Sequence, residues 1–207
     1  MAREAEAVGN RLTGFVLAGG ASRRMGHDKA QIRWKQGTLL THAIEQVKPV
    51  ASEVFVVGAV AAENLPVPVL PDGLQGLGPL AGIQAALRYS ETDWNLVLAV
   101  DLPLVTPAML AWLADLRIGT SRPAIVPLVQ LRLQPLCAIY RRELLPQIDE
   151  ALAERDSSIH RLLERLSTRI IEEDQLIANG FSPEMFLNVN TPEDLERAQV
   201  IAKSMHG

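Results

Sequence analysis

The chain has 207 residues, of which 48 % are hydrophobic and 21 % are charged, and its formal net charge is −4. This composition is typical of a globular protein that buries a core, and it argues against an intrinsically disordered chain. It also argues against general binding of nucleic acid, which usually requires an excess of positive charge, although a local positive cluster can still bind phosphate.

Short apolar runs alternate with amphipathic stretches in the first part of the chain. Strands are predicted at Thr13–Ala18, Glu53–Val57, Val67–Leu70 and Asn95–Val100, and helices at Thr41–Pro49, Leu80–Tyr89 and Thr106–Leu116. The apolar run Asn95–Val100 suits a central strand that is covered on both faces. Thr106 followed by Pro107 is typical of a helix N-cap with proline at the first helical position.

The pattern is less regular after Leu116. Strands are predicted at Ala124–Val129, Gln134–Tyr140 and Thr168–Glu172, and helices at Arg141–Leu152, Ser158–Leu166 and Thr191–Lys203. The last helix has Thr191 as its N-cap and Asp194 three residues later. Alternating strands and helices predict an α/β fold, a three-layer sandwich with a mostly parallel central sheet.

A glycine-rich, basic segment follows the first predicted strand and reads LAGGASRRMGHDK from Leu17 to Lys29. Its glycines are Gly19, Gly20 and Gly26, and its cations are Arg23, Arg24 and Lys29. Glycines let the backbone approach a ligand closely, and successive N–H groups in such a loop can bind an anion. The segment matches neither the Walker A nor the dinucleotide pattern. It therefore indicates a different kind of phosphate loop, unless it is a turn with solvated arginines.

Asp101 closes the predicted central strand. Ligands of open α/β sheets bind at the carboxyl ends of strands, and Mg²⁺ prefers one or two carboxylates together with substrate phosphates. We therefore expect Asp101 to bind magnesium; the alternative is a solvated aspartate in a turn.

Two further segments carry groups suited to binding. The run Gly78-Pro79-Leu80-Ala81-Gly82 opens a helix with bare backbone, which can bond to the edge of a base, unless it is an ordinary loop. Asn188 and Asn190 alternate along an extended segment, so both amides are expected to point to one side.

These segments, in this order, resemble the molybdenum cofactor guanylyltransferases. LAGGASRRMGHDK is similar to that family's LAGGxSxRMGxDK loop, GPLAG at Gly78–Gly82 matches its GPLAG segment, and NVNTPED at Asn188–Asp194 is similar to its NxNTPED ending. The resemblance runs from Thr13 to about Arg197. The first motif alone marks the wider group of nucleotidyltransferases, and the combination with the other two is more specific.

The resemblance implies a Rossmann-like fold and the transfer of GMP from GTP to molybdopterin that already carries molybdenum, with Mg²⁺ as cofactor. It implies nucleotide contacts from the first loop and from two later segments. These residues are Leu17, Ala18, Gly19, Gly20, Lys29, Asp72, Gly78, Pro79, Leu80 and Asp101. Asp101 is then the metal ligand, and Asn188 and Asn190 lie on the acceptor side. Gly58 stands where some members carry an asparagine that touches the nucleotide.

The expected mechanism needs no protein base, because the attacking phosphate of the acceptor is already ionised at neutral pH. Lys29 and Arg23 would neutralise charge on the leaving pyrophosphate, and Asp101 would hold the metal. A cytidylyltransferase, a sugar-phosphate nucleotidyltransferase and a nucleotide-binding regulatory module without turnover remain alternatives.

The expected organisation follows from these assignments. Residues 1–12 are predicted to be a flexible arm and residues 13–207 one domain, with a nucleotide-binding half at 13–120 and an acceptor-binding half at 121–207. The irregular stretch Pro123–Ser182 is expected to hold an acceptor-binding insertion. Since Met1–Arg11 has no apolar segment of a signal peptide and Cys137 is a single, packing cysteine, we expect a cytoplasmic protein. Its partners would be GTP and molybdenum-molybdopterin, without nucleic acid or membrane, and with molybdoenzymes or their insertion chaperones as further candidates.

Overall fold

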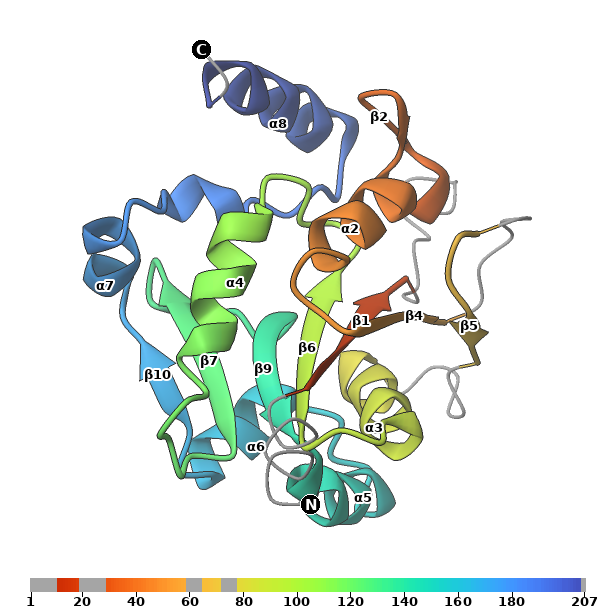
Figure 1. The fold of residues 1–207 in the computed structure, drawn as a ribbon, viewed down its shortest axis with the longest axis vertical. Coiled ribbons are helices and arrows are strands. Elements are labelled where there is room, and N and C mark those ends of the chain that lie inside the picture. Colours follow the sequence, from red (N-terminus) through yellow and green to blue (C-terminus); the bar gives the residue numbers. More distant parts are fainter. Residues whose placement is uncertain (1–10, 19–28, 59–64, 72–77, 206–207) are drawn as a thin grey trace.

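The structure is a computed structural model and describes residues 11–18, 29–58, 65–71 and 78–205. Its main strands form one mixed sheet with the order β10-β7-β9-β6-β1-β4-β5 (Figure 1). The strands are β1 Leu12–Leu17, β4 Glu53–Val57, β5 Val69–Leu70, β6 Trp94–Ala99, β7 Ala124–Val129, β9 Cys137–Arg141 and β10 Arg169–Ile171, while β8 Arg132–Leu133 pairs with β7 and β2 Arg33–Trp34 pairs with β3 Gly37–Thr38.

Parallel pairing dominates the sheet. β1 is parallel to both β4 and β6, β4 to β5, and β7 to β10, whereas β9 runs antiparallel to β6 and β7. The carboxyl ends of β1, β4 and β6 therefore lie at the same edge. The α/β class and the mostly parallel central sheet are confirmed.

Helices cover both faces and complete the three layers. The helices are α2 Leu39–Val47, α3 Pro79–Tyr89, α4 Pro107–Asp115, α5 Leu145–Ala153, α6 Ile159–Arg165, α7 Glu173–Ala178 and α8 Pro192–Ser204, with short 3₁₀ turns η1 Lys29–Gln31, η2 Arg142–Leu144 and η3 Pro183–Phe186. Side chains of α2, α4 and α7 pack with one face of the sheet, and those of α3, α5 and α6 pack with the other. Helix α8 lies beyond the carboxyl end of β6 (Figure 1) and joins the first apolar cluster through Ala198 and Ile201. Each face thus has its own apolar cluster.

The expected helix caps at Thr106 and Thr191 are present. Thr106 accepts a hydrogen bond from the N–H of Met109, and Thr191 forms a reciprocal capping box with Asp194. Helix α2 begins at Leu39, two residues before the prediction, because Thr38 caps it by accepting a hydrogen bond from the N–H of Thr41.

The stretch from Pro123 to Ser182 differs from the expectation of an insertion. Its strands β7, β9 and β10 extend the central sheet, with β9 next to β6. The predicted helix at Arg141–Leu152 begins later, because Arg141 ends β9 and the 3₁₀ turn η2 precedes α5. Helix α7 and the pairings of β2 with β3 and of β7 with β8 had no counterpart in the sequence prediction.

The boundary predicted for the N-terminal arm lies next to the start of β1 at Leu12, and residues 1–10 lie outside the described part. Among the described residues, no helix combines the length and the apolar character needed to cross a membrane.

Candidate functional site

Three distant segments meet beyond the carboxyl end of β6. Lys29 begins η1, Asp101 follows β6, and Asn190 precedes α8. The Nζ atom of Lys29 donates hydrogen bonds to Asp101 Oδ2 at 3.1 Å and to Asn190 Oδ1 at 2.5 Å. These contacts span 72 and 161 positions of the sequence. Three residues that were predicted separately therefore form one cluster, which we call the Lys29 cluster (Lys29, Asp101 and Asn190).

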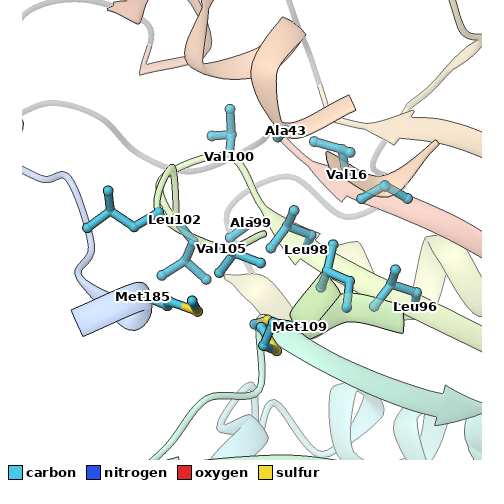
Figure 2. Close-up of a cluster of buried hydrophobic side chains, with 14 of the residues drawn as sticks. Val16, Ala43, Leu96, Leu98, Ala99, Val100, Leu102, Val105, Met109 and Met185 are labelled. Atoms are coloured by element: carbon cyan, nitrogen blue, oxygen red, sulfur yellow. The ribbon is translucent and has the colours of Figure 1, made fainter. Parts of the chain in front are cut away.

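Asp101 is held in place by the core on both sides. Val100 and Leu102 are 5 % and 3 % exposed, and Figure 2 shows both among the buried side chains at the end of β6. The N–H of Val100 donates to the carbonyl of Leu17 at 3.1 Å, which ties this turn to β1. The aspartate thus sits on a rigid strand end, the kind of support that precise ligand contacts need.

The carboxylate of Asp101 is only partly satisfied. Its side chain is 18 % exposed, and Oδ2 forms the ion pair with Lys29. Oδ1 is buried and has no hydrogen-bond partner among the described residues. An unpaired buried acceptor costs about 1–3 kcal/mol. Such an atom is suited to a ligand that supplies a cation or a donor.

The donor set fits a magnesium ion. Asp101 Oδ1 is a hard oxygen, and Mg²⁺ characteristically takes one or two carboxylates together with water and substrate phosphates. The described residues contain no group of three or more His, Cys, Asp or Glu side chains that would form an all-protein metal cage. The site therefore suits a metal that arrives with a phosphate substrate.

Asn190 is fixed by backbone hydrogen bonds of its segment to Asp101 and to the start of α8. The N–H of Val189 donates to the carbonyl of Asp101 at 2.8 Å. Asp194 Oδ2 accepts from the N–H of Asn190 at 3.0 Å and from the N–H of Thr191 at 2.9 Å. The Asn190 N–H is the largest of the effects that hold the pKa of Asp194 below its usual value. The ionised capping carboxylate therefore keeps Asn190 in position.

Asn188 does not join the Lys29 cluster. Its side chain is exposed, and its Nδ2 donates to the nearby carbonyl of Phe186 at 3.5 Å. Of the two predicted amides, the structure brings Asn190 to Lys29 and leaves Asn188 available on the surface.

The start of α3 presents bare backbone, as predicted. Gly78 precedes the helix with φ 72° and ψ −166°, and no side chain of the described residues caps it. Those angles belong to a region that essentially only glycine occupies. Pro79 is exposed, whereas the side chain of Leu80 is fully buried, so that Leu80 can offer a ligand only its backbone. The helix start also provides the positive end of a dipole.

Helix α3 packs closely on β1. A Cβ atom at Gly82 would lie 3.5 Å from Leu17 Cδ1. The Leu17 side chain is buried and its carbonyl accepts from Val100, whereas the N–H of Ala18 donates to Val57 at 2.9 Å. The Leu17 side chain thus fills the space between β1 and α3.

Several predicted site residues lie outside the described residues. They are Gly19, Gly20, Arg23 and Asp72. Gly58 is described; it has φ 124°, and its N–H donates to the carbonyl of Leu70 at 3.0 Å.

Sequence reasoning missed His42, which supports the turn after Asp101. His42 is 8 % exposed, and its Nε2 lies 2.9 Å from the carbonyl of Pro103. A carbonyl only accepts, so Nε2 carries the proton. Burial is the main effect that lowers the pKa of His42, and the ring is accordingly neutral near pH 7. No local pattern signals this contact, because the partners are 61 positions apart.

Comparisons with known proteins identify relatives of this chain. Residues 14–170 match the family model described as MobA-like NTP transferase domain. A probable molybdenum cofactor guanylyltransferase of Carboxydothermus hydrogenoformans is 35 % identical over 190 residues, covering 90 % of this chain and 94 % of the relative. One of Bacillus mycoides is 32 % identical over 199 residues, covering 92 % of this chain and 96 % of the relative.

A solved structure has the same fold. The molybdopterin-guanine dinucleotide biosynthesis protein A of Archaeoglobus fulgidus superimposes with a TM-score of 0.81 at 27 % sequence identity. The match covers 93 % of this chain and 99 % of that one.

Proposed function

Because the chain belongs to the MobA-like NTP transferase family, we propose that it transfers GMP from GTP to molybdenum-bearing molybdopterin and releases pyrophosphate. The observation that carries this proposal is the Lys29 cluster. It combines one cation, one carboxylate with an unpaired oxygen and one amide at the carboxyl edge of the sheet.

In the proposed reaction an oxygen of the acceptor's terminal phosphate attacks the α-phosphorus of GTP. The new P–O bond joins the two phosphates, and the bond to the oxygen shared with the β-phosphate breaks. That oxygen leaves with its electron pair as part of pyrophosphate. The attacking phosphate is ionised at neutral pH, so catalysis depends on positioning and charge stabilisation.

Lys29 supplies the fixed positive charge. Asp101 and Asn190 accept two of its three N–H donors in the described part of the chain, which leaves a third to offer a phosphate oxygen. This arrangement aims the ammonium group before substrate arrives, and preorganised charge of this kind lowers the barrier most effectively. We assign Arg23 of the first loop the same task toward the leaving pyrophosphate.

We propose Mg²⁺ as the cofactor, with Asp101 as its protein ligand through the unpaired Oδ1. When bound, the ion would neutralise phosphate charge and orient the reacting groups. Asp101 in turn stays fixed between Val100 and Leu102, and Lys29 stays beside it as the second positive group.

The two substrates occupy different sides of the Lys29 cluster in this proposal. The nucleotide lies over the end of β1 and the start of α3, with Ala18, Gly78, Pro79 and the backbone of Leu80 around it and Leu17 beneath. We assign it further contacts from Gly19, Gly20 and Asp72 on the resemblance of the motifs. The acceptor lies toward Asn188 and Asn190. The division into a nucleotide half, 13–120, and an acceptor half, 121–207, follows the same assignment, and both halves share one sheet.

The base is chosen by the backbone at the start of α3, because the phosphate loop meets only phosphates. Guanine offers a carbonyl beside an N–H and an amino group, which a backbone N–H and C=O pair can match. Adenine reverses this polarity, and each buried mismatch costs about 1–3 kcal/mol. We therefore propose a preference for GTP.

The direct test is pyrophosphate release with GTP, CTP or ATP in the presence of molybdenum-molybdopterin. We expect release with GTP and little with the other two. A preference for CTP would overturn the assignment of guanine as the base. It would not affect the fold or the proposed role of the Lys29 cluster. Nucleotide binding without release from any nucleotide would indicate a regulatory module.

The metal assignment is tested separately with Asp101→Asn. This variant keeps the side-chain shape and removes the negative charge, so it should need much more Mg²⁺ for its remaining activity. An unchanged Mg²⁺ dependence would contradict the assignment of Asp101 as the metal ligand.

A further inference from the structure

A cavity outside the Lys29 cluster lies between the β2–β3 hairpin and α8. Its volume is about 570 Å³, and its lining residues are Trp34, Lys35, Gln199, Ala202 and Lys203. A volume of this size is typical of sites for small molecules. The two lysines give the cavity positive charge in a protein whose net charge is −4.

The β2–β3 turn brings Lys35 to the cavity. Lys35 has φ 49°, in the left-handed region that non-glycine residues rarely adopt. Two-residue hairpin turns require a positive φ, so the turn between Trp34 and Gly37 accounts for this angle. The hairpin thereby places Lys35 next to Trp34 at the wall of the cavity.

Both walls continue directly from the Lys29 cluster. β2 begins at Arg33, four residues after Lys29, and α8 begins at Pro192, two residues after Asn190. Gln199 and Lys203 lie about 10 Å and about 16 Å along the axis of α8 from its first residue, at a rise of 1.5 Å per residue. A molecule held at Lys29 can therefore extend along α8 into the cavity.

A second connection runs through His42. Its ring lies 5.9 Å from that of Trp34, centroid to centroid, and its Nε2 contacts the carbonyl of Pro103 at 2.9 Å. Pro103 lies two residues after Asp101. The wall of the cavity and the turn that carries Asp101 are thus joined by packed side chains.

The direction of the reaction decides which substrate reaches this cavity. The attacking oxygen and the leaving pyrophosphate lie on opposite sides of the α-phosphorus. In the proposed function the nucleotide lies over β1 and the start of α3. Figure 1 shows α8 and β2 beyond the carboxyl end of β6, away from α3. The cavity is therefore open to the acceptor.

Resting on the proposed function, we propose that this cavity holds the non-phosphate body of the acceptor, a flat heterocycle that carries negative charge. Ala202 contacts its apolar surface above the buried Trp34 indole, which is only 2 % exposed, and Lys35 and Lys203 pair with its negative groups. The acceptor's terminal phosphate then lies at the Lys29 cluster, and Gln199 supplies hydrogen bonds that a nitrogen-rich ring can use.

Filling the cavity is the sharpest test. Ala202→Phe places a ring inside it, whereas Val200→Phe adds the same ring on the exposed side of α8, where Val200 is 67 % exposed. We expect Ala202→Phe to raise KM for molybdenum-molybdopterin about tenfold, with kcat and KM for GTP changed less than about twofold, as for lost uniform binding. The Val200→Phe control should behave as wild type.

Removing the charges gives a second readout that does not depend on tolerating a large side chain. Lys35→Asn suits the left-handed backbone, and Lys203→Gln suits a helix. The double variant should raise KM for the acceptor about five- to tenfold. This is the loss of affinity expected when two partly exposed ion pairs are removed. Lys48→Gln, at an exposed lysine after α2, is the matched control.

Three results would overturn this inference. The first is an acceptor KM that stays at the control value in both the filled and the uncharged variants. The second is a change of oligomeric state in Ala202→Phe with normal acceptor KM, which would assign the cavity to a contact between copies of the chain.

The third result separates failure of the cavity proposal from failure of the proposed function. If wild type transfers no GMP, the proposed function fails, and molybdopterin binding measured by quenching of tryptophan fluorescence tests the cavity alone. Equal affinity of wild type and Ala202→Phe in that measurement would reject the cavity site.

Discussion

The two ends of β1 and β6 bury polar groups in opposite ways. At the amino end, Thr13, Thr92 and Asn95 are at most 8 % exposed, and each is paired within the protein. Thr13 and Thr92 share a hydrogen bond of 2.8 Å between their hydroxyls, Thr92 Oγ1 also donates to Trp94 O at 2.9 Å, and Asn95 Nδ2 donates to Tyr140 O at 3.4 Å. At the carboxyl end, Asp101 keeps a buried oxygen without a described partner.

This is the difference expected between a structural polar network and a ligand site. A buried network that is fully paired stabilises one conformation, and its members have no bonding capacity left for a ligand. A buried carboxylate oxygen that is unpaired costs stability until a ligand supplies the missing partner. We therefore propose different functions for the polar residues at the two ends of these strands, and substitutions at the two ends should have opposite consequences.

The largest expected effect is on catalysis at the carboxyl end. Lys29→Ala removes the charge that we propose is aimed at the phosphates, and turnover should fall on the order of 10²–10³-fold, as for loss of a transition-state donor. The melting temperature should change by only a few degrees, since the Lys29 side chain is outside the apolar core. Turnover and thermal melting are compared with those of Lys48→Ala, an exposed lysine outside the cluster. Near-normal turnover of a folded Lys29→Ala protein would remove Lys29 from the mechanism.

Substitutions at the amino end should lower stability and leave turnover almost unchanged. Thr92→Val keeps the volume and removes a buried hydroxyl that Thr13 and Trp94 share. Unpaired groups left behind should cost about 1–3 kcal/mol of unfolding free energy, or several degrees in Tm. Turnover per folded molecule should stay within about twofold, because the change is remote from the cluster. A large loss of kcat with unchanged Tm would break the proposed separation of the two ends.

A substitution at Gly78 should affect both stability and substrate binding, with a smaller effect on the reaction than Lys29→Ala. A Cβ at this position meets no atom of the described residues within 4 Å, so the cost that the structure shows for Gly78→Ala is backbone strain. The strain should cost about 1–3 kcal/mol of unfolding free energy if the backbone keeps its angles. Otherwise the start of α3 should shift away from its present backbone angles. We expect KM for GTP to rise, with kcat less affected. Gly119→Ala, also at positive φ with open space and located between α4 and β7, is the control that should leave KM unchanged.

The smallest effect is a dependence on pH through His42. Because burial lowers its pKa from the ordinary 6.5, the unfolded chain takes up a proton before the folded protein does. The stability contributed by neutral His42 is therefore fully present above pH 6.5 and is lost as the pH falls toward the folded pKa. The melting temperature of wild type should fall more steeply than that of His42→Gln between about pH 7.5 and about pH 5. Parallel curves would show that His42 is not the titrating group.

Strong local signals made much of the fold predictable. β1, β4, β6 and α3 lie within two residues of their predicted bounds, since each has a clear apolar run or helix start. The strands β2, β3 and β8 have two residues each, and α7 has six, lengths too short for periodicity to show. The antiparallel direction of β9 follows from the short link after β7, because a parallel connection needs a crossover of a dozen or more residues.

The components of the candidate site were predictable, but their contacts were not. Motifs identified Lys29, Asp101 and Asn190, and the strand end explained the position of Asp101. The contact between Lys29 and Asn190 spans 161 positions, and only the folded sheet brings them together. Alternation along the chain suggested equal roles for Asn188 and Asn190, yet the capping carboxylate of Asp194 fixes Asn190 alone at the cluster.

The most direct test of the account is a double-mutant cycle on the rate of pyrophosphate release with GTP and molybdenum-molybdopterin. The rates of Lys29→Gln, Asp101→Asn and the double variant are measured at saturating Mg²⁺ and compared with wild type. If Lys29 and Asp101 act as one unit, the double variant should be about as slow as the slower single variant, as for other residues that work together. Two losses that simply multiply would contradict the central claim, because Lys29 and Asp101 would then act independently in the transfer.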